Sequence, residues 1–109
     1  MRKIINVDVC SSGGGCYLFT GALTNNEFFL ASNDFFDVRI INRNPNDFDY
    51  EKIWMSDWQE ECLIEDLTDF KERKSFFENL FKYFKQNKPS DYDIYNMSWM
   101  KETLENFND

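Results

Sequence analysis

The sequence predicts an α+β fold: an N-terminal antiparallel β-meander of about four strands, followed by two or three helices packed on one face. Two observations indicate this class. Up to about Asn42, segments rich in β-branched and aromatic residues alternate with turn residues, as strands do. After Pro45, apolar residues recur at spacings of three and four, as in helices. We expect the 109 residues to form a single domain, 1–109, with mainly strands in 1–43 and mainly helices in 44–109.

Four apolar segments predict the strands, and turn residues separate them. The predicted strands are 3–10, 16–22, 27–31 and 35–41. The predicted connections are a glycine-rich loop, 11–15, and two asparagine-containing turns, 24–26 and 32–34. Because glycine and asparagine adopt positive φ at low cost, we expect each connection to be a hairpin between neighbouring strands.

Capping signals and helical periodicity predict the helices. Ser56-Asp57-Trp58-Gln59 has the S-x-x-Q form of a capping box and predicts a short helix over 57–67. An N-cap at Asp69 and phenylalanines at helical spacing predict a longer helix that ends near Gln86, before a proline. Segment 92–99 is ambiguous; we favour a short strand or turn, then a terminal helix.

The composition excludes several kinds of chemistry. The chain contains no histidine, so catalysis by Ser-His-Asp or Cys-His groups and histidine-ligated metal sites cannot form within it. Its three cysteines, Cys10, Cys16 and Cys62, are too few for a disulfide scaffold and lack the close spacing of common zinc sites. We therefore expect no catalytic residue, no metal, no cofactor and a reducing, cytoplasmic location.

Neither a signal peptide nor a membrane span is predicted. The apolar run at the N-terminus is interrupted at Asn6 and Asp8, which makes it shorter than the apolar core of a signal peptide. No segment reaches about 18 uncharged apolar residues, the length needed to cross a bilayer. We expect no association with membranes.

The acidic residues are concentrated in one part of the chain. The net charge of the chain is −8, and segment 44–70 alone carries nine acidic residues and one basic residue. On a helix over 57–67, four carboxylates would share one arc opposite the apolar side: Asp57, Glu60, Glu61 and Glu65. Like charges four residues apart destabilise a helix, so stability alone does not favour this pattern. With about one charge per 3 Å, the arc would approach the phosphate spacing along a DNA strand.

Two interpretations of this acidic segment stay open. It is either a solvated face, which pairs with the basic residues of 71–88, or a surface that binds a partner. Aromatic residues favour the second interpretation, because we expect several of Trp54, Trp58, Phe28, Phe36 and Tyr50 to lie near the surface. The predicted partner-binding residues are Asp47, Asp49, Glu51, Trp54, Asp57, Trp58, Glu60, Glu61, Ile64 and Glu65.

These features predict a small acidic non-enzymatic binding protein that inhibits a larger protein with a basic, nucleic-acid-binding groove by imitating nucleic acid. Its negative charge disfavours direct binding of nucleic acid. Phage-encoded inhibitors of bacterial defence, including anti-CRISPR proteins, share its size and charge; so do immunity proteins that neutralise nuclease toxins. A different class stays open: a small-molecule or nucleotide-binding domain that uses the 11–15 loop. Monomer and homodimer are both compatible with the sequence.

Overall fold

The computed structural model describes residues 2–13, 16–34, 36–87, 102, 105 and 106. The chain forms two compact units, Met1–Leu67 and Thr68–Asp109. The first unit contains the sheet and the second contains the longest helix, so the predicted α+β class is confirmed. That 1–109 forms a single domain stays a prediction. The ambiguous segment 92–99 lies outside the described residues.

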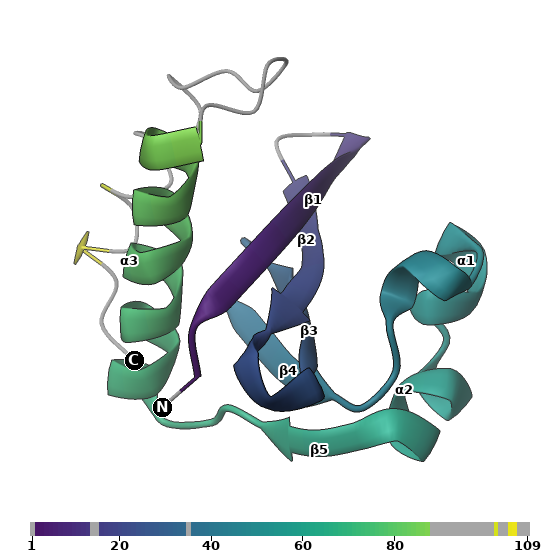
Figure 1. Ribbon diagram of the computed structural model, residues 1–109. Helices are drawn as coiled ribbons and strands as arrows, with labels where there is room; N and C mark the ends of the chain where they lie inside the picture. The colour runs from purple at the N-terminus through teal and green to yellow at the C-terminus, as the bar shows by residue number, and fades with distance from the viewer. Residues whose placement is uncertain (1, 14–15, 35, 88–101, 103–104, 107–109) are drawn as a thin grey trace. The chain divides into compact units, whose positions relative to one another are not determined.

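The first unit contains an antiparallel sheet with the strand order β1-β2-β3-β4-β5 (Figure 1). Its first four strands confirm the predicted meander, and a fifth strand, which the sequence does not predict, extends it at the β4 edge. The strands are β1 (Ile4–Gly13), β2 (Cys16–Leu23), β3 (Phe28–Ser32), β4 (Asp37–Ile41) and β5 (Leu63–Asp66).

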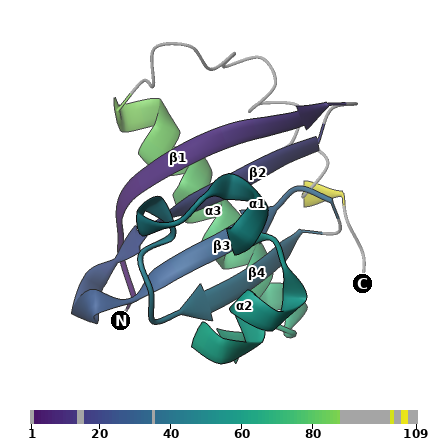
Figure 2. The ribbon, with the colours of Figure 1, turned by 90° about the vertical axis from the view of Figure 1, so that its right-hand side faces the viewer.

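Three α-helices and two short 3-10 helices complete the described structure. The 3-10 helices are η1 (Thr24–Asn26), in the connection from β2 to β3, and η2 (Pro45–Asp47), after β4. Two short helices of the first unit follow, α1 (Tyr50–Ile53) and α2 (Ser56–Cys62), and they lie on the same side of the sheet (Figure 2). The second unit contains α3 (Phe70–Asn87), which matches the predicted long helix.

The predicted helix over 57–67 is wrong beyond Cys62, because the chain there becomes strand β5. Hydrogen bonds to β4 replace the helical ones: the backbone N–H of Asn42 donates to Cys62 O (2.9 Å), and that of Leu67 donates to Val38 O (3.0 Å). The β4 edge thus satisfies backbone groups that a longer helix would have satisfied internally. Sequence periodicity does not reveal this edge.

The expected capping box is also absent from α2. The N-cap residue is Met55, no side chain caps the helix, and Ser56 is its first residue. The side chain of Gln59 instead donates to Ile53 O at the end of α1 (3.0 Å). Gln59 therefore joins the two helices rather than closing the start of α2.

Helices α1 and α2 pack on the sheet through one hydrophobic cluster. Leu30 and Ile41 of the sheet contact Ile53, Trp58 and Cys62 of the helices, and all five are at most 5 % exposed. Of the five aromatic residues of which we expect several near the surface, Trp58 and Phe36 are buried (4 % exposed each), Trp54 and Phe28 are half-buried, and Tyr50 is exposed. The rings of Trp58 and Phe36 contribute to cores, the usual location of large aromatic side chains.

Candidate partner-binding surface

All ten predicted partner-binding residues lie between η2 and β5, in the first unit. Asp47, Asp49 and Glu51 are exposed on or beside η2 and α1, and Trp54 is half-buried at the end of α1. The other six residues belong to α2 and β5: Asp57, Trp58, Glu60 and Glu61 on α2, and Ile64 and Glu65 on β5. Because α2 and β5 are different elements, the four carboxylates Asp57, Glu60, Glu61 and Glu65 do not form the single helical face that the sequence predicts.

Three of the acidic residues form an outward face of α2. Asp57, Glu60 and Glu61 are all exposed. At 100° per residue they span an arc of about 100°, which faces away from the buried Trp58 and Cys62. We call Asp57, Glu60 and Glu61 the α2 acidic face. The buried residues on the opposite side fix the orientation of this face on the sheet.

The carboxylates of the α2 acidic face differ in their ion pairs. Glu61 Oε2 lies 3.8 Å from Arg43 Nη1, and the Glu61 side chain stays 66 % exposed. Among residues 2–13, 16–34 and 36–87, Asp57 and Glu60 form no ion pair within 4.0 Å. A weak, exposed ion pair adds little stability, so most of the negative charge of this face is not compensated locally.

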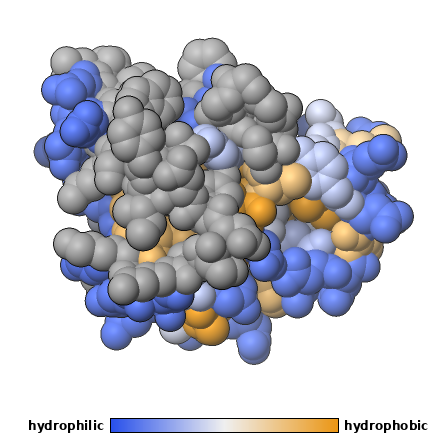
Figure 3. Space-filling model, turned by 90° about the horizontal axis from the view of Figure 1, so that it is seen from above, coloured by the Kyte–Doolittle hydropathy of each residue, from blue (hydrophilic) through white to orange (hydrophobic). Residues whose placement is uncertain are grey.

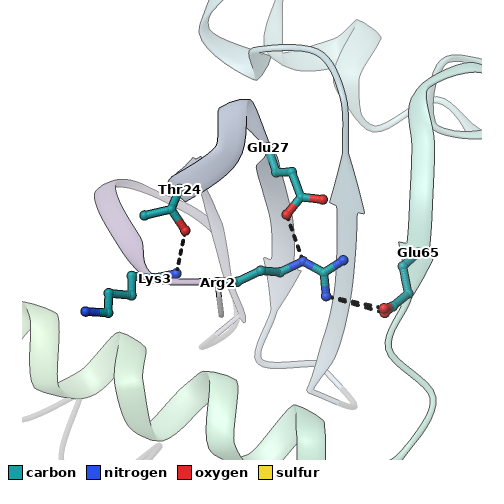
Figure 4. Close-up of polar contacts among 5 residues, drawn as sticks. All are labelled: Arg2, Lys3, Thr24, Glu27 and Glu65. Carbon is teal, nitrogen blue, oxygen red and sulfur yellow. Dashed lines mark hydrogen bonds and ion pairs between the residues drawn. The ribbon is translucent and has the colours of Figure 1, made fainter.

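Glu65, which the sequence places on the same face, points instead toward Arg2 (Figure 4). Arg2 Nη1 donates to both carboxylate oxygens of Glu65 (3.3 and 3.4 Å), and Arg2 Nε donates to Glu27 Oε1 (2.9 Å). The hydrogen bond from Arg2 to Glu27 and the nearby charge of Glu65 raise the pKa of Arg2 above its ordinary value. The phosphate-like spacing predicted over 57–65 is therefore wrong at Glu65, and only the α2 acidic face retains it.

A polar network that the sequence does not predict lies behind α2. Arg39 of β4 donates a hydrogen bond to Gln59 Oε1, and its Nε lies 3.9 Å from Asp66 Oδ2. Gln59 is only 6 % exposed and uses its amide nitrogen on Ile53 O. The network connects β4, β5, α1 and α2. Its one sequence signal, an arginine between the apolar residues Val38 and Ile40, carries no information about its partners.

Exposed apolar side chains accompany the acidic residues. The large ones in the described part of the chain include Met55 and Tyr50 at the helices (58 and 44 % exposed) and Leu63 and Ile64 on β5 (40 and 45 %). Figure 3 shows small hydrophobic areas between hydrophilic ones on the right-hand side of the molecule, the side of α1. Of these residues, the sequence predicts exposure only for Tyr50 and names Ile64 as a site residue.

The hydrophobic cluster formed by Leu30, Ile41, Ile53, Trp58 and Cys62 contains one ionisable group, the Cys62 thiol. The side chain of Cys62 is fully buried, and Sγ donates to Trp58 O (3.2 Å). Burial raises the pKa of the Cys62 thiol, although the nearby Arg43 partly opposes the effect. The thiol therefore stays protonated at neutral pH, which is the state of an inert core cysteine.

No family model, no curated protein sequence and no solved structure matches this chain. No helix in the described part of the chain is both long and apolar enough to cross a bilayer. Within the same residues, no three cysteine or acidic side chains are grouped so that they can hold a metal ion.

Proposed function

We propose that this chain is a non-enzymatic binding protein whose α2 acidic face occupies a basic, nucleic-acid-binding groove of a larger protein and excludes nucleic acid from it. One observation carries the proposal: Asp57 and Glu60 are exposed and form no ion pair among the described residues. Carboxylates that no internal cation compensates are available to lysine and arginine side chains of a partner.

The short spacing of these carboxylates supports imitation of a nucleic-acid backbone. Glu61 lies four positions after Asp57, which corresponds to a rise of about 6 Å along the helix axis. Successive phosphates of one DNA strand are about 3.4 Å apart along the duplex axis, so this face presents charge at a comparable axial density over a short distance. The negative potential would accelerate encounter with a basic groove, more strongly at low salt.

Apolar side chains near this face supply the contact area that charge alone lacks. Met55 directly precedes α2 and Leu63 directly follows it, and both are exposed. Burial of apolar surface contributes about 25 cal/mol per Å², whereas an exposed ion pair contributes at most about 1 kcal/mol. We therefore expect the carboxylates to determine association rate and specificity, and the apolar side chains to slow dissociation.

The test is capture of a partner followed by competition with nucleic acid. The tagged chain is incubated with extract of its native cells at about 0.05 M and about 0.5 M salt, and retained proteins are identified by mass. We expect a nucleic-acid-binding protein that is retained only at low salt and is displaced by added duplex DNA or RNA. The identity of this protein distinguishes an anti-defence inhibitor from a toxin immunity protein.

A matched pair of variants connects the result to the α2 acidic face. D57K/E60K/E61K reverses this face, and D8K/E72K/E78K changes the net charge by the same amount at exposed acidic residues elsewhere. We expect the first variant to lose the partner and the second to retain it at least partly. Equal retention by the two variants, with both folded, contradicts the proposal. So does a retained protein that nucleic acid cannot displace.

A further inference from the structure

The two edges of the sheet differ in how well they are protected against pairing with a further strand. The β5 edge is only four residues long, is paired irregularly at Ile40 and Ile41 of β4, and carries Glu65 and Asp66. Short length, irregular pairing and charge are features that prevent a sheet edge from adding a strand. The β1 edge is ten residues long and has one charged residue, Asp8. Its register shifts lie near its two ends, so 6–11 is a regular edge without this protection.

Hydrogen bonds of β2 and its flanking turn show how the backbone groups alternate. Thr24 N–H donates to Lys3 O, beside β1 (3.0 Å), whereas Tyr17 O accepts from Asn33 N–H, on the β3 side (3.3 Å). Neighbouring residues of a strand direct their backbone groups to opposite sides. The even-numbered residues of β2 therefore bond to β1, and the odd-numbered ones bond to β3.

The register of β1 then identifies the backbone groups at its outer edge. Leu18 and Thr20 of β2 lie opposite Cys10 and Asp8, so the backbone groups of Cys10 and Asp8 are used within the sheet. The residues that alternate with them direct N–H and C=O away from β2: Val7, Val9 and Ser11. Among the described residues, the two valines form no hydrogen bond beyond the pairing with β2. This edge therefore presents a row of donors and acceptors to a further strand.

Exposed apolar side chains lie beside the same edge. Ile5 of β1 is 56 % exposed, and Tyr50 of α1 is 44 % exposed. Partial removal from water and, to a smaller extent, the nearby thiol of Cys10 raise the pKa of Tyr50, so α1 brings this ring close to β1. An added strand would thus gain apolar contacts as well as backbone hydrogen bonds.

The regular part of β1 is complementary to itself when two copies run antiparallel. With Val9 opposite Val9 of the second copy, Val7 lies opposite Ser11, and the three outward residues of each strand form about six hydrogen bonds in total. In this register Asp8 lies opposite Cys10 of the second copy, so the two Asp8 carboxylates do not face each other directly.

We propose that a second copy of this chain pairs antiparallel with the outer edge of β1, about a two-fold axis at Val9. The two edges that remain in the described sheets are then both β5, which is protected, so assembly stops at the dimer. A basic partner suits this edge less well, because β1 offers it a single carboxylate.

The dimer places two binding surfaces on the same side. Opposed residues of antiparallel strands point to the same face of a sheet. Helices α1 and α2 lie on one side of the sheet (Figure 2), so those of both copies lie on one side of the joint sheet. Two α2 acidic faces are therefore presented together.

Net charge makes this dimer weak and determines its response to salt. Each copy has a net charge of −8, so two copies repel each other. A contact of one strand is also small beside the roughly 800 Å² per partner of a typical stable interface. Added salt screens the repulsion. The dimer therefore becomes stronger at high salt, whereas capture of a basic partner becomes weaker.

The test is sedimentation of the isotope-labelled full chain, followed by amide hydrogen exchange measured by NMR. We expect a monomer–dimer equilibrium with a dissociation constant of about 0.1 mM at about 0.5 M salt, and weaker association at about 0.05 M salt. The amides of Val7 and Val9 should exchange about fivefold more slowly when the dimer predominates than after dilution. The amides of Asp8 and Cys10, which already bond to β2, should change much less.

A pair of proline variants connects the dimer to this edge. V9P removes one outward donor, at a position where an edge strand tolerates proline because the N–H does not bond within the sheet. We expect it to weaken dimerisation at least about tenfold and to keep a native circular dichroism spectrum. S56P is the control: Ser56 is the first residue of α2, and Met55 before it has φ of −80° and ψ of 135°, which suit a following proline. It should dimerise as the wild type does.

Four outcomes overturn the inference. The first is a chain that stays monomeric at about 1 mM and about 0.5 M salt. The second is slow exchange at Val7 and Val9 that persists in the dilute monomer, which would show that the chain itself covers this edge. The third is a dimer in which these two amides stay unprotected, or one that folded V9P retains. The fourth is a dimer that dissociates at high salt, since it would be held by charge. The exchange pattern of the wild type decides the question even if V9P does not fold.

Discussion

The acidic residues of α2 and β5 are adjacent in sequence but have different environments. On β5, Glu65 is bound by Arg2 and Asp66 lies near Arg39. On α2, Asp57 and Glu60 form no ion pair among the described residues. The strand brings its carboxylates near arginines that are distant in sequence, Arg2 before β1 and Arg39 opposite Asp66 on β4. The outward side of a surface helix faces no neighbouring strand. One run of negative charge thus contains carboxylates that are paired within the fold and carboxylates that are exposed without an ion pair among the described residues.

The largest loss of stability should come from a substitution in the core beneath α2, the helix that carries the exposed carboxylates. Trp58 packs edge-to-face on Phe48 (5.1 Å between ring centroids) and is 4 % exposed. We expect W58A to lower the free energy of unfolding by about 3–5 kcal/mol, because it leaves a cavity under the helix. Urea unfolding followed by circular dichroism measures the change.

Two variants control for the position and size of this substitution. Y50A, at a side chain that is 44 % exposed, should cost less than about 1 kcal/mol. W58F should cost much less than W58A, since it keeps an aromatic ring and removes an indole N–H that has no hydrogen-bond partner among the described residues. Equal losses in W58A and Y50A would show that Trp58 does not support α2.

A smaller change in folding stability is expected when pH rises, because of the Cys62 thiol at the end of α2. Burial raises the pKa of the Cys62 thiol in the folded protein, while an unfolded chain releases this proton at about pH 8.5. Above that pH the folded state binds more protons than the unfolded state, so stability decreases as pH rises, by at most about 1.4 kcal/mol per pH unit. Melting temperatures of the wild type and C62A at about pH 7 and about pH 10 measure this term.

The difference between the two proteins isolates Cys62, because other groups titrate in both. The wild type should lose more stability than C62A between the two pH values. A thiol reagent provides a second readout: the exposed Cys10 should react rapidly, and Cys62 only upon unfolding. Parallel losses in the wild type and C62A, or rapid modification of Cys62 in the folded protein, would contradict its burial.

The sequence predicts those parts of the fold that depend on local signals. Strands β1 to β4 follow from alternation and turn residues, and Asn25 and Asn26 adopt the positive φ expected of a turn (66° and 60°). Helix α3 follows from its phenylalanine spacing. These features need only neighbouring residues, so periodicity and turn chemistry suffice to identify them.

The fifth strand and the pairing of charges depend on contacts between distant residues. Residues 63–66 become a strand because the β4 edge offers hydrogen bonds, and Glu65 is bound by a residue 63 positions away, Arg2. The local helical pattern, in contrast, is enough to predict that Asp57, Glu60 and Glu61 are exposed and that Trp58 lies on the opposite side of the helix, which the structure buries. Local pattern places a charge on a surface but does not identify its partners.

The smallest changes in stability are expected from two substitutions that each remove one negative charge, one on β5 and one on α2. They test whether the carboxylates of these two elements differ in their contribution to the fold. E65Q breaks the ion pairs with Arg2, whose side chain is 35 % exposed, and should cost up to about 1 kcal/mol. D57N loses a favourable interaction with the α2 dipole but relieves repulsion by Glu60 and Glu61, so its effect should be close to zero. Urea unfolding at about 0.05 M and about 1 M salt compares them.

A double-mutant cycle of R2Q with E65Q separates the ion pair from other effects of each substitution. We expect a coupling of about 0.2–1 kcal/mol that decreases at high salt, because both side chains are partly exposed and are screened by ions. A cycle of R2Q with D57N should show no coupling. Coupling of the same size in both cycles would mean that Asp57 is compensated within the fold, as Glu65 is, and the distinction between structural and available carboxylates would not hold.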